Sequence, residues 1–198
     1  MTLTRNDLWS LEQYSEKRLE FREKVLAHKK ARVVNLNQNA RLLFEDELTL
    51  RYQIQEMLRI EKVFEAAGIQ EELDVYNELM PDGDNWKATF MLEYTDIEER
   101  RIALSKLIGV EDKVWMQVAG HNKVYAIADE DLARENDVKT SSVHFMRFQL
   151  LPAMIKDAVQ GAVIAGGCDH ENLFIAGITV SENTRMSLVN DLDNATLN

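Results

Sequence analysis

Cysteine is nearly absent from the 198-residue chain, which contains one, Cys168. A single cysteine excludes an internal disulfide and any metal or cluster site built only from the cysteines of one chain. Long hydrophobic runs are also missing, because the longest weakly polar run, residues 161–167, is far shorter than the ~20 apolar residues that span a bilayer. The first residues are charged throughout and lack the apolar run of a signal peptide. We therefore expect a cytoplasmic protein without a membrane partner.

Positive charge is scarce relative to negative charge, with 23 Lys and Arg against 34 Asp and Glu and a formal net charge of −11. This balance disfavours general binding to nucleic acid or to anionic membranes, because both depend on cationic surfaces. The sequence also lacks the glycine-rich dinucleotide motif, the P-loop, the hydrolase nucleophile elbow, His-Glu-x-x-His and Glu-x-x-His. These absences remove the common nucleotide cradles and the usual zinc-protease and ferritin-like di-iron signatures.

The composition that remains is that of a globular protein, with 45% hydrophobic and 29% charged residues. It contains no repeat, linker or low-complexity block, so we predict a single domain over residues 1–198. Within it we distinguish three parts. They are a helical arm at 1–32, an α+β core at 33–180, and a C-terminal helix with a frayed tail at 181–198.

The predicted fold class is α+β, with a mainly antiparallel sheet of about six strands, helices packed mostly on one face of it and an N-terminal helical arm. Alternation is clearest around WKATFMLEY, where Trp86, Ala88 and Phe90 share one side of a strand. The expected strands are 33–36, 41–45, 87–94, 113–118, 123–128 and 143–150. The open edges of such a sheet need covering, and a homodimer is one way to cover them.

Residues that favour helix starts and ends predict helices in the rest of the chain. The longest expected helix begins at Asp46 and stops at Gly68, a residue suited to the left-handed conformation that follows many helices. Pro152 suits the first turn of a later helix, which is expected to fray into the glycines at 161, 166 and 167. The other expected helices cover about 8–31, 70–80, 96–107, 128–135 and 182–192.

The long helix contains one unexpected acid. At about 100° per residue, Glu61 falls within the apolar stripe formed by Leu50, Ile54, Met57 and Phe64. A carboxylate that faces a core is costly unless it is paired or protonated. Arginines of the same helix, Arg147 on a strand, or an imidazole are the candidate partners.

His144 lies on the more apolar face of the strand 143–150 and is the imidazole that we consider first. If His144 and Glu61 meet, they form either a buried structural hydrogen bond or half of a site for a divalent metal such as iron, manganese or zinc. His121, at the tip of a predicted hairpin, and Glu56 are the further candidate ligands. Structural roles are the alternative for all four residues.

Two further sets of residues are candidates for binding. His28, Lys29 and Lys30 form a basic patch in an acidic chain, which suits an acidic partner or a phosphate, and the alternative is a solvated helix face. A pocket for a small ligand is the third possibility for the chain. Its candidate residues are Trp86, Trp115 and Arg147.

A family resemblance is carried by four runs, LLFEDELTLRYQIQEMLRIEKVFE, EELDVYNELMPDGDNWKATFMLEY, VWMQVAGHNKVYAIADEDLARE and KTSSVHFMRFQL. From NDLWSLEQY to about residue 180, the chain resembles the bacterial family of unknown function DUF3501. Genes of that family often neighbour those of a rubrerythrin-like protein and an iron–sulfur oxidoreductase. The resemblance therefore implies a role near peroxide handling or electron transfer, and it supplies no catalytic residues.

Two functional hypotheses follow. The missing catalytic motifs, the acidic charge and the basic helix favour a non-catalytic accessory or interaction protein that works with a rubrerythrin-like or iron–sulfur partner in the cytoplasm. The alternative is a non-haem metal-dependent enzyme or metal-binding protein that uses the histidines and glutamates named above. Metal analysis of the purified protein separates these hypotheses.

Overall fold

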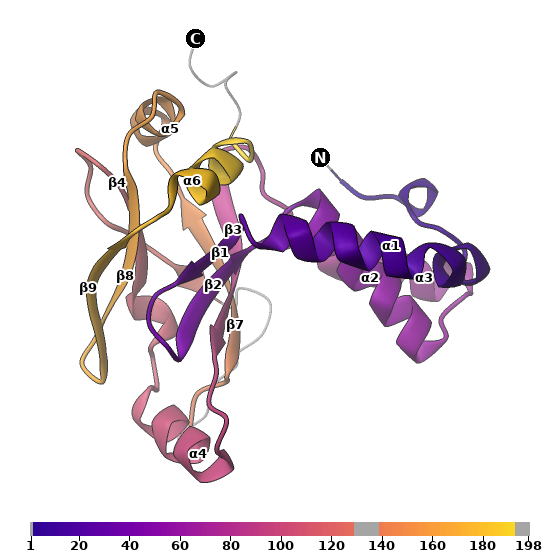
Figure 1. Cartoon of the computed structure of the whole chain (residues 1–198), viewed down its shortest axis with the longest axis horizontal. Coiled ribbons are helices and arrows are strands. Elements are labelled where there is room, and N and C mark those ends of the chain that lie inside the picture. Colours follow the sequence, from indigo (N-terminus) through magenta and orange to yellow (C-terminus); the bar gives the residue numbers. More distant parts are fainter. Residues whose placement is uncertain (1, 129–138, 193–198) are drawn as a thin grey trace.

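The computed structural model describes residues 2–128 and 139–192 of the chain. Within these residues it contains six α-helices, two 3-10 helices and nine β-strands (Figure 1). In chain order the elements are η1 (Arg5–Asp7), α1 (Leu11–Lys29), β1 (Val33–Asn35), β2 (Ala40–Phe44), α2 (Glu47–Glu61), α3 (Ala66–Asn77), β3 (Asn85–Leu92), α4 (Ile97–Lys106), η2 (Glu111–Lys113), β4 (Val114–Val118), β5 (Val124–Tyr125), β6 (Ile127–Ala128), β7 (Val143–Gln149), α5 (Pro152–Val159), β8 (Ile164–His170), β9 (Leu173–Thr179) and α6 (Glu182–Val189).

The first sheet contains five antiparallel strands in the order β1-β2-β3-β7-β6. Its centre shows the alternation expected from the sequence, because Trp86, Ala88, Phe90 and Leu92 of β3 are buried while Lys87 and Met91 on the other face are only partly buried. Thr89, on that second face, is buried as well. A slip of one residue in this register would expose the whole apolar set. The strand predicted at 87–94 is thus confirmed, with observed bounds Asn85–Leu92.

The second sheet contains four antiparallel strands in the order β5-β4-β8-β9. The segment 123–128, expected as one strand, is divided between the two sheets, since β5 pairs with β4 and β6 pairs with β7. Ala126 lies between them, is buried, and donates its backbone N–H to the carbonyl oxygen of Val114. The chain crosses from one sheet to the other at this residue.

The main hydrophobic core joins the buried side chains of both sheets. Leu42 and Phe90 come from the first sheet, Met116, Ile164 and Cys168 come from the second, and all five are fully buried. Burial of each aliphatic or aromatic side chain of this kind stabilises the fold by about 1.5–3 kcal/mol. Helices α5 and α6 pack at one end of the two sheets and α4 lies at the other end (Figure 1).

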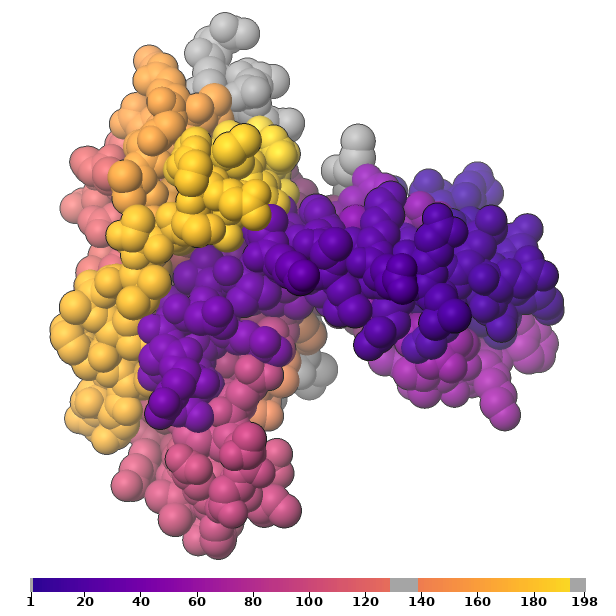
Figure 2. Space-filling model, viewed as in Figure 1, coloured from indigo at the N-terminus to yellow at the C-terminus, as the bar shows by residue number. Residues whose placement is uncertain are grey.

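The helical arm is formed by η1, α1, α2 and α3, which project together away from the sheets (Figures 1 and 2). It is therefore larger than the predicted arm at 1–32, because α2 and α3 belong to it as well. Tyr14, Phe21 and Val25 form the buried face of α1, seven and four residues apart, against α2. The hairpin of β1 and β2 lies between α1 and α2 in the sequence and joins the arm to the first sheet.

The helix expected over 46–67 ends earlier than predicted. Lys62 adopts the left-handed conformation with φ 57°, and the N–H of Val63 bonds back to the carbonyl oxygen of Leu58. This turn stops α2 at Glu61. Gly68, expected to end the helix, lies instead in the first turn of α3.

Strand β8 was not predicted, since glycines disfavour a strand and the helix before it was expected to fray into them. Tertiary contacts explain the strand. A side chain at Gly167 would collide with the Trp115 ring and the backbone of β9, so glycine is the residue that lets the strands pack there. The tight packing of Trp115 therefore overrides the low strand propensity.

The α+β class and the antiparallel pairing are confirmed, and two details of the prediction differ. The strands are divided between two sheets, and the helices lie in the arm and at the ends of the sheets. The expected helix at 128–135 falls largely outside the described residues, as does the expected tail at 193–198. No helix in the described part of the chain is long and apolar enough to cross a membrane.

Candidate functional site

The end of the helical arm is closed by the N-terminal residues, which lie across α2 and α3 and are held by two amide side chains. Asn77 accepts from the N–H of Leu3 at 2.8 Å and donates to its carbonyl oxygen at 2.9 Å. Gln55 makes the same pair of bonds with Trp9, at 2.7 and 3.4 Å. Each amide therefore satisfies both polar groups of one backbone residue, as a neighbouring strand does. We call residues Leu3–Ser10 the N-terminal strap.

The Trp9 ring anchors the strap to the helices. It packs edge-on against Phe21 with the ring centroids 4.9 Å apart, and the guanidinium of Arg51 lies 4.5 Å from its centroid. Such aromatic and cation–π contacts each contribute on the order of 1 kcal/mol beyond area burial. Ser10 then caps α1 by accepting from the N–H of Gln13.

Glu56 joins α1 to α2 and does not face an open site. Its carboxylate accepts from the Tyr14 hydroxyl at 2.6 Å and from both ends of the Arg18 guanidinium at 2.7 and 2.9 Å, while Arg59 adds a bond at 3.3 Å. The bonds from Arg18 outweigh the effect of burial and lower the pKa of Glu56 from 4.5 to about 2. The geometry explains Glu56 as a structural acceptor inside the arm.

Replacing Glu56 with glutamine is expected to lower the free energy of unfolding by about 1–2 kcal/mol at pH 7, because the charge-assisted bonds to Arg18 are lost. A carboxylate whose folded pKa is lowered stabilises the fold above its unfolded pKa, and that contribution disappears as the pH falls from about 4.5 to about 2. Urea denaturation at a series of pH values measures both effects. Parallel stability curves for the wild type and the variant between pH 5 and pH 2 would contradict this assignment.

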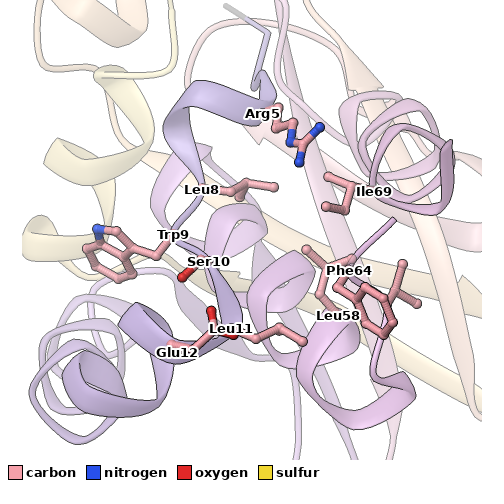
Figure 3. Close-up of a pocket in the computed structure, with 10 residues that line it drawn as sticks. Arg5, Leu8, Trp9, Ser10, Leu11, Glu12, Leu58, Phe64 and Ile69 are labelled. Carbon is pink, nitrogen blue, oxygen red and sulfur yellow. The ribbon is translucent and has the colours of Figure 1, made fainter. Parts of the chain in front are cut away.

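A hollow of about 280 Å³ lies beside the strap, at the free end of the arm (Figure 3). In Figure 3 the side chains of Leu8, Leu11, Ile69 and Phe64 border a common space, while the Trp9 indole points away from it. Phe64 is 70% exposed, unusually high for a phenylalanine. The residues that line the hollow are Arg5, Leu8, Trp9, Ser10, Leu11, Glu12, Leu58, Val63, Phe64 and Ile69.

Acidic side chains outnumber basic ones in the two segments that line this hollow. Residues 5–12 and 58–72 contain the acids Asp7, Glu12, Glu61, Glu65, Glu71 and Glu72 and the cations Arg5, Arg59 and Lys62. Of these, Arg5 and Glu12 line the hollow itself, and Arg59 is paired with Glu56. The pKa of Glu72 is raised, first by its partial burial and then by the negative charges of Glu61 and Glu71. Glu72 is therefore close enough to Glu61 and Glu71 to be repelled by both.

The prediction that Glu61 faces the core is wrong. Because the turn at Lys62 ends α2, the last turn of the helix protrudes into solvent, and Ile60, Glu61 and Phe64 are all exposed. The 100° periodicity applies to Ile60 and Glu61 at the end of α2, while Phe64 lies beyond the helix. Within the described residues, no element packs over this end of the stripe to bury them.

His144 is fully buried on β7, as its position on the apolar face predicts, and its carboxylate neighbour is not Glu61. The imidazole Nε2 lies 2.9 Å from the Thr140 hydroxyl and 3.8 Å from a carboxylate oxygen of Glu111 in η2. The His144 ring also lies against Phe90, with the ring centroids 6.4 Å apart. A histidine–carboxylate neighbourhood therefore exists, with an acid that the sequence analysis did not select.

His121 lies at the tip of the hairpin, and its Nε2 is 2.7 Å from a carboxylate oxygen of Asp157 on α5. The four candidate ligands His144, Glu61, His121 and Glu56 thus have separate surroundings. Across residues 2–128 and 139–192, no three His, Cys, Asp or Glu side chains are grouped as metal ligands.

The residues of the predicted basic patch have different surroundings. His28 lies 2.5 Å from the carboxylate of Asp46, the N-cap residue of α2, and the Lys29 ammonium lies 5.8 Å from the centre of the Tyr52 ring. Lys30 is exposed. His28 and Lys29 therefore contribute to packing between α1 and α2.

The three residues proposed for a small-ligand pocket have different surroundings. Trp86 is fully buried and donates to the carbonyl oxygen of Leu188 at 3.0 Å. Trp115 belongs to the second sheet, where it donates to Asp169 at 3.1 Å. Arg147, on β7, donates to the side chain of Gln149 at 2.7 Å.

Cys168 is buried in the main core, and burial raises the pKa of its thiol to about 11. A thiol with that pKa is protonated at neutral pH and is a poor nucleophile. His170 accepts from the N–H of Asn172 through Nδ1, so its Nε2 donates to the carbonyl oxygen of Ile108 at 3.1 Å. Both residues therefore have structural surroundings.

The residues that matter most at the end of the arm were missed by sequence reasoning. Gln55 and Asn77 look like ordinary helix-surface amides, and their partners lie 46 and 74 residues away in the chain. Phe64 was assigned to a buried stripe. The signal available in the sequence was the hydrophobic strap itself, with Leu3, Leu8 and Trp9 before the first capped helix.

These features define an α+β protein with two antiparallel sheets and a projecting helical arm that ends in an apolar hollow. Residues 2–192 match the model of the family DUF3501, described as a protein of unknown function. The chain belongs to this family, which confirms the resemblance seen in the sequence.

A solved structure shares the fold. It is the 1.90 Å crystal structure of a novel protein of unknown function from Burkholderia pseudomallei K96243. That protein is 50% identical to this chain, with a TM-score of 0.94 over 98% of this chain and 100% of the other. No match is found among curated proteins.

Proposed function

We propose that this protein is a non-catalytic accessory protein of a cytoplasmic redox or peroxide-handling system, and that it acts by binding a partner protein. The partner is a rubrerythrin-like protein or an iron–sulfur oxidoreductase of the kind whose genes neighbour those of the family. The alternative, a metal-dependent enzyme, has less support, because the His and Glu residues selected for it are distributed over separate parts of the fold.

The observation that carries the proposal is the helical arm. It projects from the sheets and presents an apolar hollow with exposed Phe64 and Ile60 at its free end (Figures 2 and 3). Exposed apolar side chains grouped within a polar rim are typical of protein-interaction sites. A hollow of about 280 Å³ is also at or below the lower limit, roughly 300 Å³, of pockets that enclose small molecules.

The test is direct binding between the purified chain and each of the two neighbouring proteins. Sedimentation velocity and calorimetry should detect a complex with one of them, with a dissociation constant on the order of 10 μM or lower, as is suitable for a transient redox partnership. The control is bovine serum albumin, an unrelated acidic protein. If neither neighbouring protein binds at concentrations about ten times higher, the redox assignment is wrong.

A further inference from the structure

We infer that the hollow at the free end of the arm receives a basic, amphipathic helical segment of a partner protein. An apolar side chain of that segment would enter beside Phe64, and its lysines or arginines would lie against the surrounding carboxylates. This inference rests on the proposed function as an interaction protein, and it specifies the chemistry of the partner surface.

The apolar part of the argument comes from the shape of the site. Leu8, Leu11 and Ile69 line a small hollow, and Phe64 stands at its rim with 70% of its surface exposed. The hollow has room for one or two side chains, and a helical segment is the smallest element that presents such anchors at positions i, i+3 or i+4. Exposed aromatic side chains next to a concave apolar surface are characteristic anchors in protein interfaces.

The charge around the hollow indicates that the partner segment is positively charged. The two segments that line the hollow contain six carboxylates and three cations, and Glu72 is close enough to Glu61 and Glu71 to be repelled by both. A basic segment would relieve this repulsion when it binds. The same charges oppose nucleic acid and anionic membrane surfaces, so neither of those would bind in this place.

The location of the site allows such a segment to approach. The arm stands clear of the two sheets (Figure 2). The amide bonds from Gln55 and Asn77 fix the strap, so the wall that contains Leu8 is already formed before binding. A preformed wall reduces the conformational entropy that association must overcome.

The experiment uses two synthetic peptides of about 14 residues with leucine at helical spacing, one with lysine and one with glutamate at the remaining positions. Isothermal titration calorimetry with the full-length chain should show that the lysine peptide binds at least about ten-fold more tightly than the glutamate peptide. Phe64→Ala should weaken binding of the lysine peptide by about ten-fold or more.

Matched variants locate the site. Phe174 on β9 is 69% exposed, so Phe174→Ala removes an equally exposed phenylalanine outside the arm and should change the affinity by less than about two-fold. Glu61→Gln with Glu72→Gln should weaken binding several-fold at about 50 mM salt and have little effect at about 500 mM salt, because salt screens the attraction. Glu171→Gln, an exposed acid on the β8–β9 turn, is the control for charge.

The inference is overturned if the lysine peptide does not bind, if both peptides bind equally, or if Phe174→Ala weakens binding as much as Phe64→Ala. These results are separate from the test of the proposed function. If a redox partner binds the wild type and Phe64→Ala equally well, the accessory role stands and this site is wrong. If the lysine peptide binds at Phe64 and neither redox protein binds, the site stands and the redox role is wrong.

Discussion

Arg32→Ala is expected to lower the free energy of unfolding by about 3–5 kcal/mol, the largest effect of a single substitution that we expect. Arg32 is 1% exposed, and its guanidinium donates to the carbonyl oxygens of Phe44 and Glu45, to Ser187, and to both carboxylate oxygens of Asp191 at 3.0 and 2.6 Å. It thus ties the base of the arm to β2 and α6. Removing it leaves a buried carboxylate and buried carbonyl groups without their donor.

Urea denaturation followed by circular dichroism measures this loss. Arg22→Ala, which removes an exposed arginine of α1, is the matched control and should cost less than about 0.5 kcal/mol. Arg32→Lys should recover only part of the stability, because an ammonium cannot reproduce the planar array of donors. A loss below about 1 kcal/mol for Arg32→Ala would contradict the role that we assign to this residue.

The pH dependence of the Arg32→Ala effect follows from Asp191. Burial raises the pKa of Asp191 to about 6, against the opposing attraction of Arg32, and removing Arg32 raises that pKa further. A carboxylate whose pKa is raised in the folded protein lowers the free energy of unfolding as the pH rises from its unfolded pKa to its folded pKa. In the variant this loss extends to higher pH, so Arg32→Ala should be more destabilising at pH 8 than at pH 5.

Gly167→Ala is expected to destabilise the protein by about 2–3 kcal/mol through overpacking. A Cβ at this position would lie 2.3 Å from Cζ2 of Trp115 and 2.5 Å from the carbonyl oxygen of Ile175. The Trp115 ring cannot move away easily, because its N–H is bonded to Asp169 and the Lys123 ammonium lies 4.2 Å from the ring centre. The gain in strand propensity on replacing glycine, about 0.5–1 kcal/mol, offsets only part of the cost.

Gly166→Ala is the neighbouring control for this prediction. A Cβ there would lie 2.8 Å from the sulfur of Met116, a flexible side chain that can shift more easily than a ring and a backbone carbonyl. Thermal denaturation should therefore give a clearly smaller loss for Gly166→Ala than for Gly167→Ala. The reverse order would show that the Trp115 ring, and not the Met116 side chain, is the more adaptable neighbour.

Local signals in the sequence predicted much of the secondary structure. The helices expected from Asp46 and from residue 96 begin directly after Asp46 and Asp96, which accept from backbone N–H groups of the first turn, and Pro152 occupies the first turn of α5. These features depend on residues a few positions apart, so they are readable without a fold. The alternation in β3 likewise predicted its buried face.

The candidate site was far less predictable. Periodicity predicted that His144 is buried, but it could not identify Glu111 as the nearby carboxylate, because the pair is brought together only when η2 packs against β7. The same periodicity placed Glu61 and Phe64 on an apolar stripe. It carried no information about where the neighbouring elements stop covering that stripe.

The sequence by itself determined the class of the fold, its antiparallel pairing, most helix starts and the family to which the chain belongs, since these follow from composition and from short-range patterns. Only the tertiary structure decided that the strands form two sheets, that three helices form one arm, and that the N-terminal strap creates an apolar hollow at its end. The reason is physical. Those features depend on contacts such as Leu3–Asn77 and Arg32–Asp191, between residues 74 and 159 positions apart, and no local preference specifies such partners.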